Sequence, residues 1–165
     1  MRQILFLIAF VSIFSSCVNA QKKALDRVLA LEAKLKLAED ASANRELAIE
    51  VVAAYNELLL VYPEIESKPE LIFKSGEVLK GLGENLKAAK SFYKVHHNFP
   101  KSKLAPLALF YQAHCFEVLE QRLTAKNTYQ EFIDRYPNHP YVSQAEGMIK
   151  LLHYSDEELI KQFQN

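Results

Sequence analysis

The sequence predicts an all-α fold, a short α-solenoid of antiparallel helix pairs with about eight helices. Three prolines, Pro63, Pro100 and Pro137, recur at intervals of 37 residues, and each follows an aromatic residue. Between them, hydrophobic residues keep the three- and four-residue spacing of amphipathic helices. A period of this length is typical of stacked helical units. Such units present a surface, so we expect binding rather than catalysis.

Composition agrees with one sizeable core. Half of the 165 residues are hydrophobic, about a quarter are charged, and the formal net charge is zero. With four Gly and six Pro, the chain is not of a disordered or fibrous class. No basic or acidic stretch indicates a nucleic-acid partner or a charged tail.

The first twenty residues have the pattern of a secretory signal. Arg2 is their only charged residue, residues 4–14 are apolar apart from Ser12, and small residues follow. This apolar stretch is shorter than the roughly 20 residues of a membrane-spanning helix. The alternative is a buried N-terminal helix.

Two processing sites are compatible with this segment. Val18 and Ala20 suit cleavage before Gln21, whereas Ser15 and Ser16 before Cys17 resemble the site at which a lipoprotein is lipidated. Lipid chains on Cys17 would hold the protein at a membrane. In either case Cys115 lacks a partner, and we expect a buried thiol.

The elements after Gln21 follow in order. Hydrophobic spacing predicts a helix at about 24–38, a break rich in capping residues at 40–44, and a helix to about 61 that Pro63 ends. Further helices are expected at about 68–82, 85–98, 104–120, 122–135 and 141–152. Gly83 and Asn85 suit the turn of one pair, and Gln121 that of the next. A capping box at 155–158 opens a last short helix to Phe163. The domain after the 1–20 segment thus spans 21–165, with units at about 24–63, 64–100 and 101–137 and capping helices at 138–165.

The repeat resembles the tetratricopeptide repeat. That family has a small residue on the first helix, an Ala and an aromatic four residues apart on the second, and a Pro at the end. Large residues flank the small one, so that two helices approach closely and fill the groove. The matching positions in the two units are Ile72, Gly76, Leu79, Ala88, Phe92 and Pro100, then Leu109, Ala113, Phe116, Ala125, Tyr129 and Pro137.

Two departures from the family pattern are informative. The usual Trp is absent, and the extra three residues of the period fall just after each proline. Repeats of this kind resemble those of bacterial envelope proteins, such as the Tol–Pal coordinator and an outer-membrane assembly lipoprotein. The resemblance covers about residues 45–150. It implies a right-handed superhelix and a non-catalytic protein–protein scaffold, periplasmic or anchored to the outer membrane as a lipoprotein.

The resemblance also implies a binding face. In a stack of helix pairs, the first helix of each pair lines the concave side. Phe73 and Phe110 recur at one repeat's spacing, as aromatic anchors for a partner protein or peptide or as packing residues between adjacent pairs. End-to-end assembly of copies is a third class of function. The candidate partner-binding residues are Glu70, Phe73, Glu77, Lys80, Leu107, Phe110, His114 and Glu117.

No pattern indicates catalysis, a metal or a cofactor. The five histidines are scattered, and the adjacent His96 and His97 point in different directions on a helix, so we expect solvated or rim positions. Gly81 and Gly83 lack the preceding strand and following Lys of a phosphate loop. The glutamates Glu77, Glu117 and Glu120 have no nucleophile beside them.

Overall fold

The structure, a computed structural model, describes residues 2–38 and 41–153, with side chains at 19–38 and 44–152. Within these residues there are seven α-helices and no strand, which confirms the all-α fold. The predicted eighth helix lies outside the described residues. The chain divides into two compact units, Met1–Lys68 and Pro69–Asn165.

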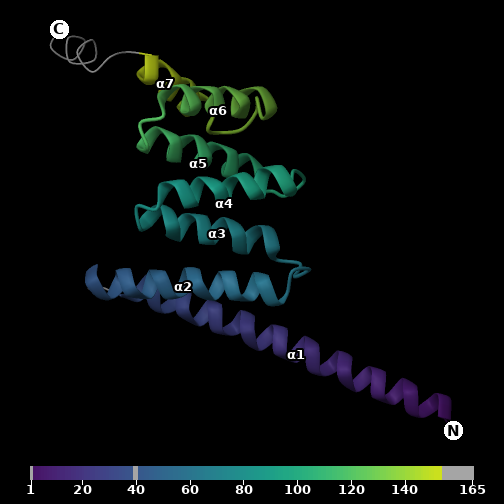
Figure 1. Ribbon diagram of the computed structural model, residues 1–165. Coiled ribbons are helices and arrows are strands. Elements are labelled where there is room, and N and C mark those ends of the chain that lie inside the picture. Colours follow the sequence, from purple (N-terminus) through teal and green to yellow (C-terminus); the bar gives the residue numbers. More distant parts are fainter. Residues whose placement is uncertain (1, 39–40, 154–165) are drawn as a thin grey trace. The chain divides into compact units, whose positions relative to one another are not determined.

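The first unit is a pair of helices, α1 (Arg2–Leu37) and α2 (Ala41–Val61), which pack on each other (Figure 1). Val28 and Leu31 of α1 and Val51, Tyr55 and Leu58 of α2 are buried. None of the described helices is both long and apolar enough to span a membrane.

The break predicted at 40–44 is wrong by several residues, because α2 already begins at Ala41. Asn44 lies near the start of α2, and its side-chain Nδ2 donates a hydrogen bond of 2.9 Å to the carbonyl of Ala38. Asn44, one of the residues that suggested a break, therefore lies inside α2 and satisfies a backbone carbonyl just after the end of α1.

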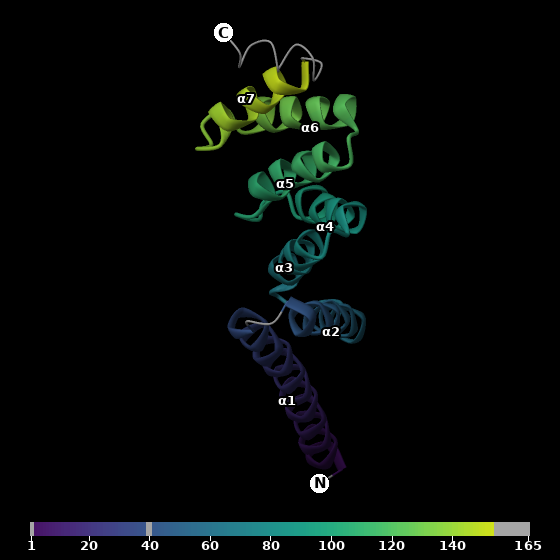
Figure 2. The ribbon, with the colours of Figure 1, turned by 90° about the vertical axis from the view of Figure 1, so that its left-hand side faces the viewer.

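The second unit contains five helices: α3 (Lys68–Gly81), α4 (Asn85–Asn98), α5 (Ala105–Val118), α6 (Arg122–Arg135) and α7 (Val142–His153). These bounds lie within two residues of those predicted. Within this unit α4 packs on α5, α5 on α6 and α6 on α7, and α4 lies to the right of α3 and α5 in Figure 2.

The turns inside the two helix pairs share one geometry. At the end of α3, Glu84 N–H donates to the Leu79 carbonyl and Gly83 N–H to that of Lys80, while Gly83 has φ of 78°. This is a Schellman motif, which needs a left-handed residue. The prediction that Gln121 does this work in the next pair is wrong: Glu120, 37 residues after Gly83, adopts φ of 57°. A side chain at this φ is strained, so Glu120 occupies a position better suited to glycine.

The three extra residues of each period form a fixed link. After Pro100, Ser102 N–H donates to the Phe99 carbonyl at 2.9 Å and Ala105 N–H to the Ser102 carbonyl at 3.0 Å. The same pair of bonds occurs 37 residues earlier and 37 residues later. In the earlier link, Ile65 N–H donates to the Tyr62 carbonyl and Lys68 N–H to the Ile65 carbonyl. In the later link, His139 N–H donates to the Tyr136 carbonyl and Val142 N–H to the His139 carbonyl. The period is therefore a property of the backbone as well as of the sequence.

Small residues allow the close approach of paired helices, as predicted. Gly76 faces the ring of Phe92, and a Cβ at residue 76 would lie 2.8 Å from Cε1 of that ring. Phe92 is fully buried, as are Ala113 and Tyr129 at the equivalent positions of the next pair.

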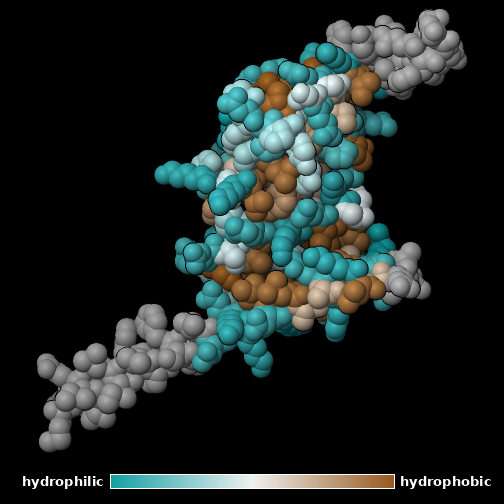
Figure 3. All heavy atoms as spheres, turned by 180° about the vertical axis from the view of Figure 1, so that it is seen from behind, coloured by the Kyte–Doolittle hydropathy of each residue, from teal (hydrophilic) through white to brown (hydrophobic). Residues whose placement is uncertain are grey.

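Apolar side chains also remain at the surface. On the face seen in Figure 3, apolar atoms gather along α2, whose exposed large hydrophobic residues are Ile49, Leu60 and Val61. On α4 and α6, Leu86 and Leu123 are exposed at equivalent positions of the repeat.

Candidate protein-binding surface

The two recurring phenylalanines are core residues rather than exposed anchors. Phe73 and Phe110 are each 4% exposed. Phe73 packs edge-on against Phe92, with ring centroids 5.3 Å apart, and Phe110 contacts Tyr129 and Phe132 of α6. Of the two interpretations of the pair, packing describes the structure, because a partner could reach these rings only by opening the helix stack.

The surface above them is centred on Tyr111. Its ring stacks on Phe73 at 5.8 Å and meets Phe110 at 6.2 Å, so the two buried phenylalanines hold it from below. The Lys80 ammonium of α3 lies 4.6 Å from the centroid of the Tyr111 ring, a cation–π contact between neighbouring helices. Burial, then the nearby Glu77, raise the pKa of Tyr111. The phenol therefore stays neutral and able to donate a hydrogen bond.

A second group lies further along α5. The buried Tyr129 of α6 donates a hydrogen bond of 2.8 Å to Oε2 of Glu117, and burial together with this bond raises the pKa of Tyr129. His114 Nδ1 lies 3.6 Å from the same carboxylate oxygen. Since Tyr129 holds one side of the carboxylate, Glu117 is fixed in place while remaining partly exposed.

We call the five residues Glu77, Lys80, Tyr111, His114 and Glu117 the inner face. They come from α3 and α5, the first helices of consecutive pairs. Their charged and polar groups lie around Tyr111, which packs on the buried Phe73 and Phe110. Four of them were predicted as partner-binding residues. Tyr111 was missed because it follows Phe110 directly and aligns with Lys74 of the previous unit, so the overlay of repeats gave it no signal.

The other predicted residues lie around this face. Leu107 is half-buried one helical turn before Tyr111 on α5. Glu70 is exposed in the first turn of α3 and borders an open cleft of about 740 Å³, lined also by the link after α4, including Lys101 and Lys103. Cys115 is fully buried as predicted, and burial raises the pKa of its thiol to about 11. A thiol in that state is a poor nucleophile.

One histidine departs from the expectation of solvated or rim positions. His96 is 4% exposed, and its Nε2 lies 2.7 Å from Oε1 of Gln112. Its Nδ1 lies 3.4 Å from Nη1 of Arg135, which also binds Glu131 at 2.7 Å. Because a guanidinium only donates, Nδ1 accepts and Nε2 carries the proton. Burial lowers the pKa of His96, so this imidazole is a neutral link between α4, α5 and α6.

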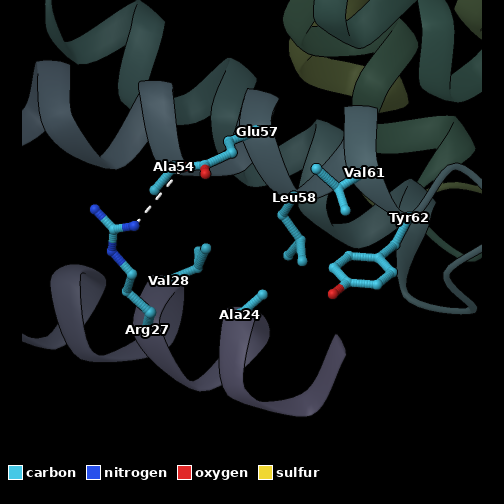
Figure 4. Close-up of a pocket in the computed structure, with 8 residues that line it drawn as sticks. All are labelled: Ala24, Arg27, Val28, Ala54, Glu57, Leu58, Val61 and Tyr62. Carbon is cyan, nitrogen blue, oxygen red and sulfur yellow. Dashed lines mark ion pairs between the residues drawn. The ribbon is translucent and has the colours of Figure 1, made fainter. Parts of the chain in front are cut away.

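The first unit contains a separate small pocket between α1 and α2 (Figure 4). Its volume is about 150 Å³, with an ion pair of 3.7 Å between Arg27 and Glu57 at its edge. Both partners of that pair are largely exposed, so it contributes little to stability. The lining residues are Ala24, Arg27, Val28, Ala54, Glu57, Leu58, Val61 and Tyr62.

Stacked helix pairs with a structured polar face on their first helices define an α-helical repeat protein. A family model described as tetratricopeptide repeat matches residues 107–139, which cover most of α5, all of α6 and the first part of the link after it. No curated protein matches the chain. Tetratricopeptide repeats generally mediate protein–protein interaction and are typically non-catalytic scaffolds.

Proposed function

We propose that this chain is a non-catalytic adaptor that binds another protein through the inner face. The observation that carries the proposal is the contact chain from Lys80 through Tyr111 to the buried Phe73. It places a partly exposed tyrosine and a partly exposed lysine against a buried phenylalanine. Tyrosines held in this way are typical centres of binding energy, because little side-chain entropy is lost when a partner docks.

The charged groups around Tyr111 would orient a partner on such a surface. Glu77 lies on α3, and along α5 His114 lies between Tyr111 and Glu117. Charged groups at the rim set the register and the association rate of a partner more than its final affinity. Glu70 and Leu107 extend the same surface toward the start of each helix. Phe73 and Phe110 support the surface from below.

We further propose that the chain is exported and acts in the bacterial cell envelope. The charged, apolar and small-residue order of residues 1–20 supports export, and the link after each proline supports the likeness to envelope repeats. The mature N-terminus tests this proposal, and mass spectrometry of protein recovered from cells would read it directly. A chain that begins at Gln21 indicates a periplasmic protein, whereas an intact Met1 contradicts export.

A second candidate is a lipid-anchored component of an outer-membrane assembly complex that uses the same inner face. The sequence around Cys17 favours it, since Ser15 and Ser16 precede that cysteine. An acylated Cys17 as the first residue of the mature chain supports this candidate, and Gln21 as the first residue excludes it.

Site-specific crosslinking tests the inner face itself. A photoreactive residue replaces Glu77 or His114, and matched controls replace Asn127 or Gln130, which are exposed on α6. We expect one partner band from both inner-face positions and none from the controls, in cells that produce the chain. Equal bands from both sets, or no band from the inner face, contradict the proposal.

A charge reversal gives an independent test. Glu77→Lys should reduce the crosslinking yield at residue 114 at least severalfold, because it places a cation where the partner meets a carboxylate. The thermal unfolding midpoint should change by no more than about 4 °C, since residue 77 is exposed and an exposed charge contributes about 0–1 kcal/mol. A loss of yield that only accompanies unfolding counts against a binding role.

A further inference from the structure

α4 and the link that follows it are rich in lysine. Between residues 84 and 103 the chain has five lysines and a single acidic residue, Glu84, although its overall formal charge is zero. We call this set the lysine row: Lys87, Lys90, Lys94, Lys101 and Lys103.

Helix geometry places the first three lysines together. Positions 87, 90 and 94 are three and four residues apart, so Lys87, Lys90 and Lys94 share one side of α4. The opposite side carries Phe92 and Val95, which are fully buried. The apolar side of α4 is thus already used inside the core, and the lysine row is a surface.

Most of these charges have no internal partner. Lys87 forms an ion pair of 3.0 Å with Glu84. In the part of the chain that the structure describes, Lys90, Lys94, Lys101 and Lys103 are exposed and have no hydrogen bond or ion pair. Their ammonium groups are available to an external anion.

The repeat architecture does not require lysine here. On α6, the positions equivalent to 87, 90 and 94 are Thr124, Asn127 and Glu131. Two helices with the same place in the fold therefore differ in charge on their outer sides. Packing explains what α4 and α6 share, and it does not explain this difference.

We propose that the lysine row docks on an anionic phospholipid membrane surface. Three features favour headgroups over a single folded acidic partner. The charges are lysines, which attract phosphates as point charges without the bidentate geometry of arginine. They spread over α4 and the link instead of converging on one point. Tyr93 lies beside the row and is 44% exposed, as suits a tyrosine at the headgroup level.

The mode of binding follows from the buried side of α4. Because the apolar residues of this helix are held in the core, α4 can adsorb to a membrane surface but cannot insert its apolar side. Adsorption of this kind is electrostatic and weakens with salt. Lys90 and Lys94, the centre of the lysine row, lie on α4. The inner face lies on α3 and α5, so the two proposals can fail separately.

Vesicle co-sedimentation of the full chain tests the proposal. Vesicles with about 30% anionic phospholipid are compared with purely zwitterionic ones at about 0.1 M salt. The apolar segment at residues 4–14 is common to all variants, so the difference between the two lipids reports the charge effect. The variant Lys90→Ala with Lys94→Ala removes the centre of the row. Lys126→Ala with Lys150→Ala, on α6 and α7, changes the net charge equally.

We expect the wild type to prefer anionic vesicles, with a preference that falls at about 0.5 M salt. The Lys90 and Lys94 pair should lower anionic partitioning by about 30-fold, since each lysine near such a surface contributes about fivefold. The control pair should change it less than about threefold. An equal fall in both pairs, or no preference for anionic lipid, overturns the proposal. Binding to an acidic polypeptide without binding to vesicles also overturns it.

Discussion

Gly76 offers the sharpest test of the packing inside a helix pair. An alanine Cβ at this position would lie 2.8 Å from Cε1 of Phe92 and 3.1 Å from Cζ. Real Cβ atoms hardly ever approach a neighbour so closely, so a group must shift. The Phe92 ring cannot move freely, because it is fully buried and packs edge-on against both Phe73 and Tyr111.

The magnitude follows from two opposing effects of Gly76→Ala. Replacing glycine inside a helix stabilises it by about 1 kcal/mol, while overpacking a tight core costs about 1–3 kcal/mol. Gly147 of α7 supplies the matched control, because a Cβ there meets nothing within 4 Å. Gly147→Ala should therefore raise the free energy of unfolding by about 0.5–1 kcal/mol. The two variants should differ by about 1–3 kcal/mol, with Gly76→Ala the less stable.

Urea unfolding, followed by far-UV circular dichroism, measures the free energy of unfolding of both variants. Both glycines lie in the second unit of the chain. A third variant, Gly76→Ala with Phe92→Leu, shortens the residue that the new methyl group strikes. The double change should be less destabilising than the sum of the single changes by about 1 kcal/mol. If Gly76→Ala stabilises the protein as much as Gly147→Ala does, the close approach of α3 and α4 is not as tight as described.

Four further predictions concern single side chains. The free energy of unfolding should fall as pH drops from about 7.5 to about 5.5, because burial lowers the pKa of His96 and the unfolded chain takes up the proton first. The fall should be smaller in His96→Gln, and an equal dependence on pH in both proteins would exclude His96 as the cause. Tyr129→Phe should lower the free energy of unfolding in urea by about 1–2 kcal/mol, since it removes the hydrogen bond to the Glu117 carboxylate. An unchanged urea midpoint would show that this hydrogen bond makes no net contribution to stability. Glu120→Gly should raise stability by about 0.5 kcal/mol, because glycine relieves the strain at φ of 57°; a loss of stability would contradict that strain. Cys115 should resist alkylation in the folded protein, with its pKa near 11, and react on unfolding, as peptide mass spectrometry can show; rapid labelling of the native protein would refute its burial.

The sequence was sufficient for the helices of the repeat because local and periodic signals agree there. Proline ends each second helix, and the small and aromatic positions at Gly76, Phe92, Ala113 and Tyr129 recur without a gap. The start of α2 could not be predicted in the same way. Asn44 is a good capping residue, but its amide acts backward on α1, which depends on how the two helices meet.

Exposure was harder to predict than helix position. Periodicity places Phe73 and Phe110 on the first helices, but it does not reveal how completely the surrounding helices cover them. His96 looked like a surface histidine beside His97, whereas Arg135, 39 residues later, helps to enclose it. Both outcomes depend on contacts between helices, which the hydrophobic pattern of a single helix does not report.

Comparison of the two repeats, 64–100 and 101–137, separates the residues that packing requires from those that are particular to this chain. Many positions that keep their residue type across the 37-residue shift are buried and are explained by packing, as Phe73 and Phe110 show, although Leu86 and Leu123 keep theirs at the surface. At the surface, by contrast, Glu77 aligns with His114 and Lys90 aligns with Asn127. Because packing does not determine these exposed positions, their identities are free to serve recognition. The repeat period therefore identifies the scaffold where it holds, and the binding surfaces are to be sought among the exposed residues where it fails.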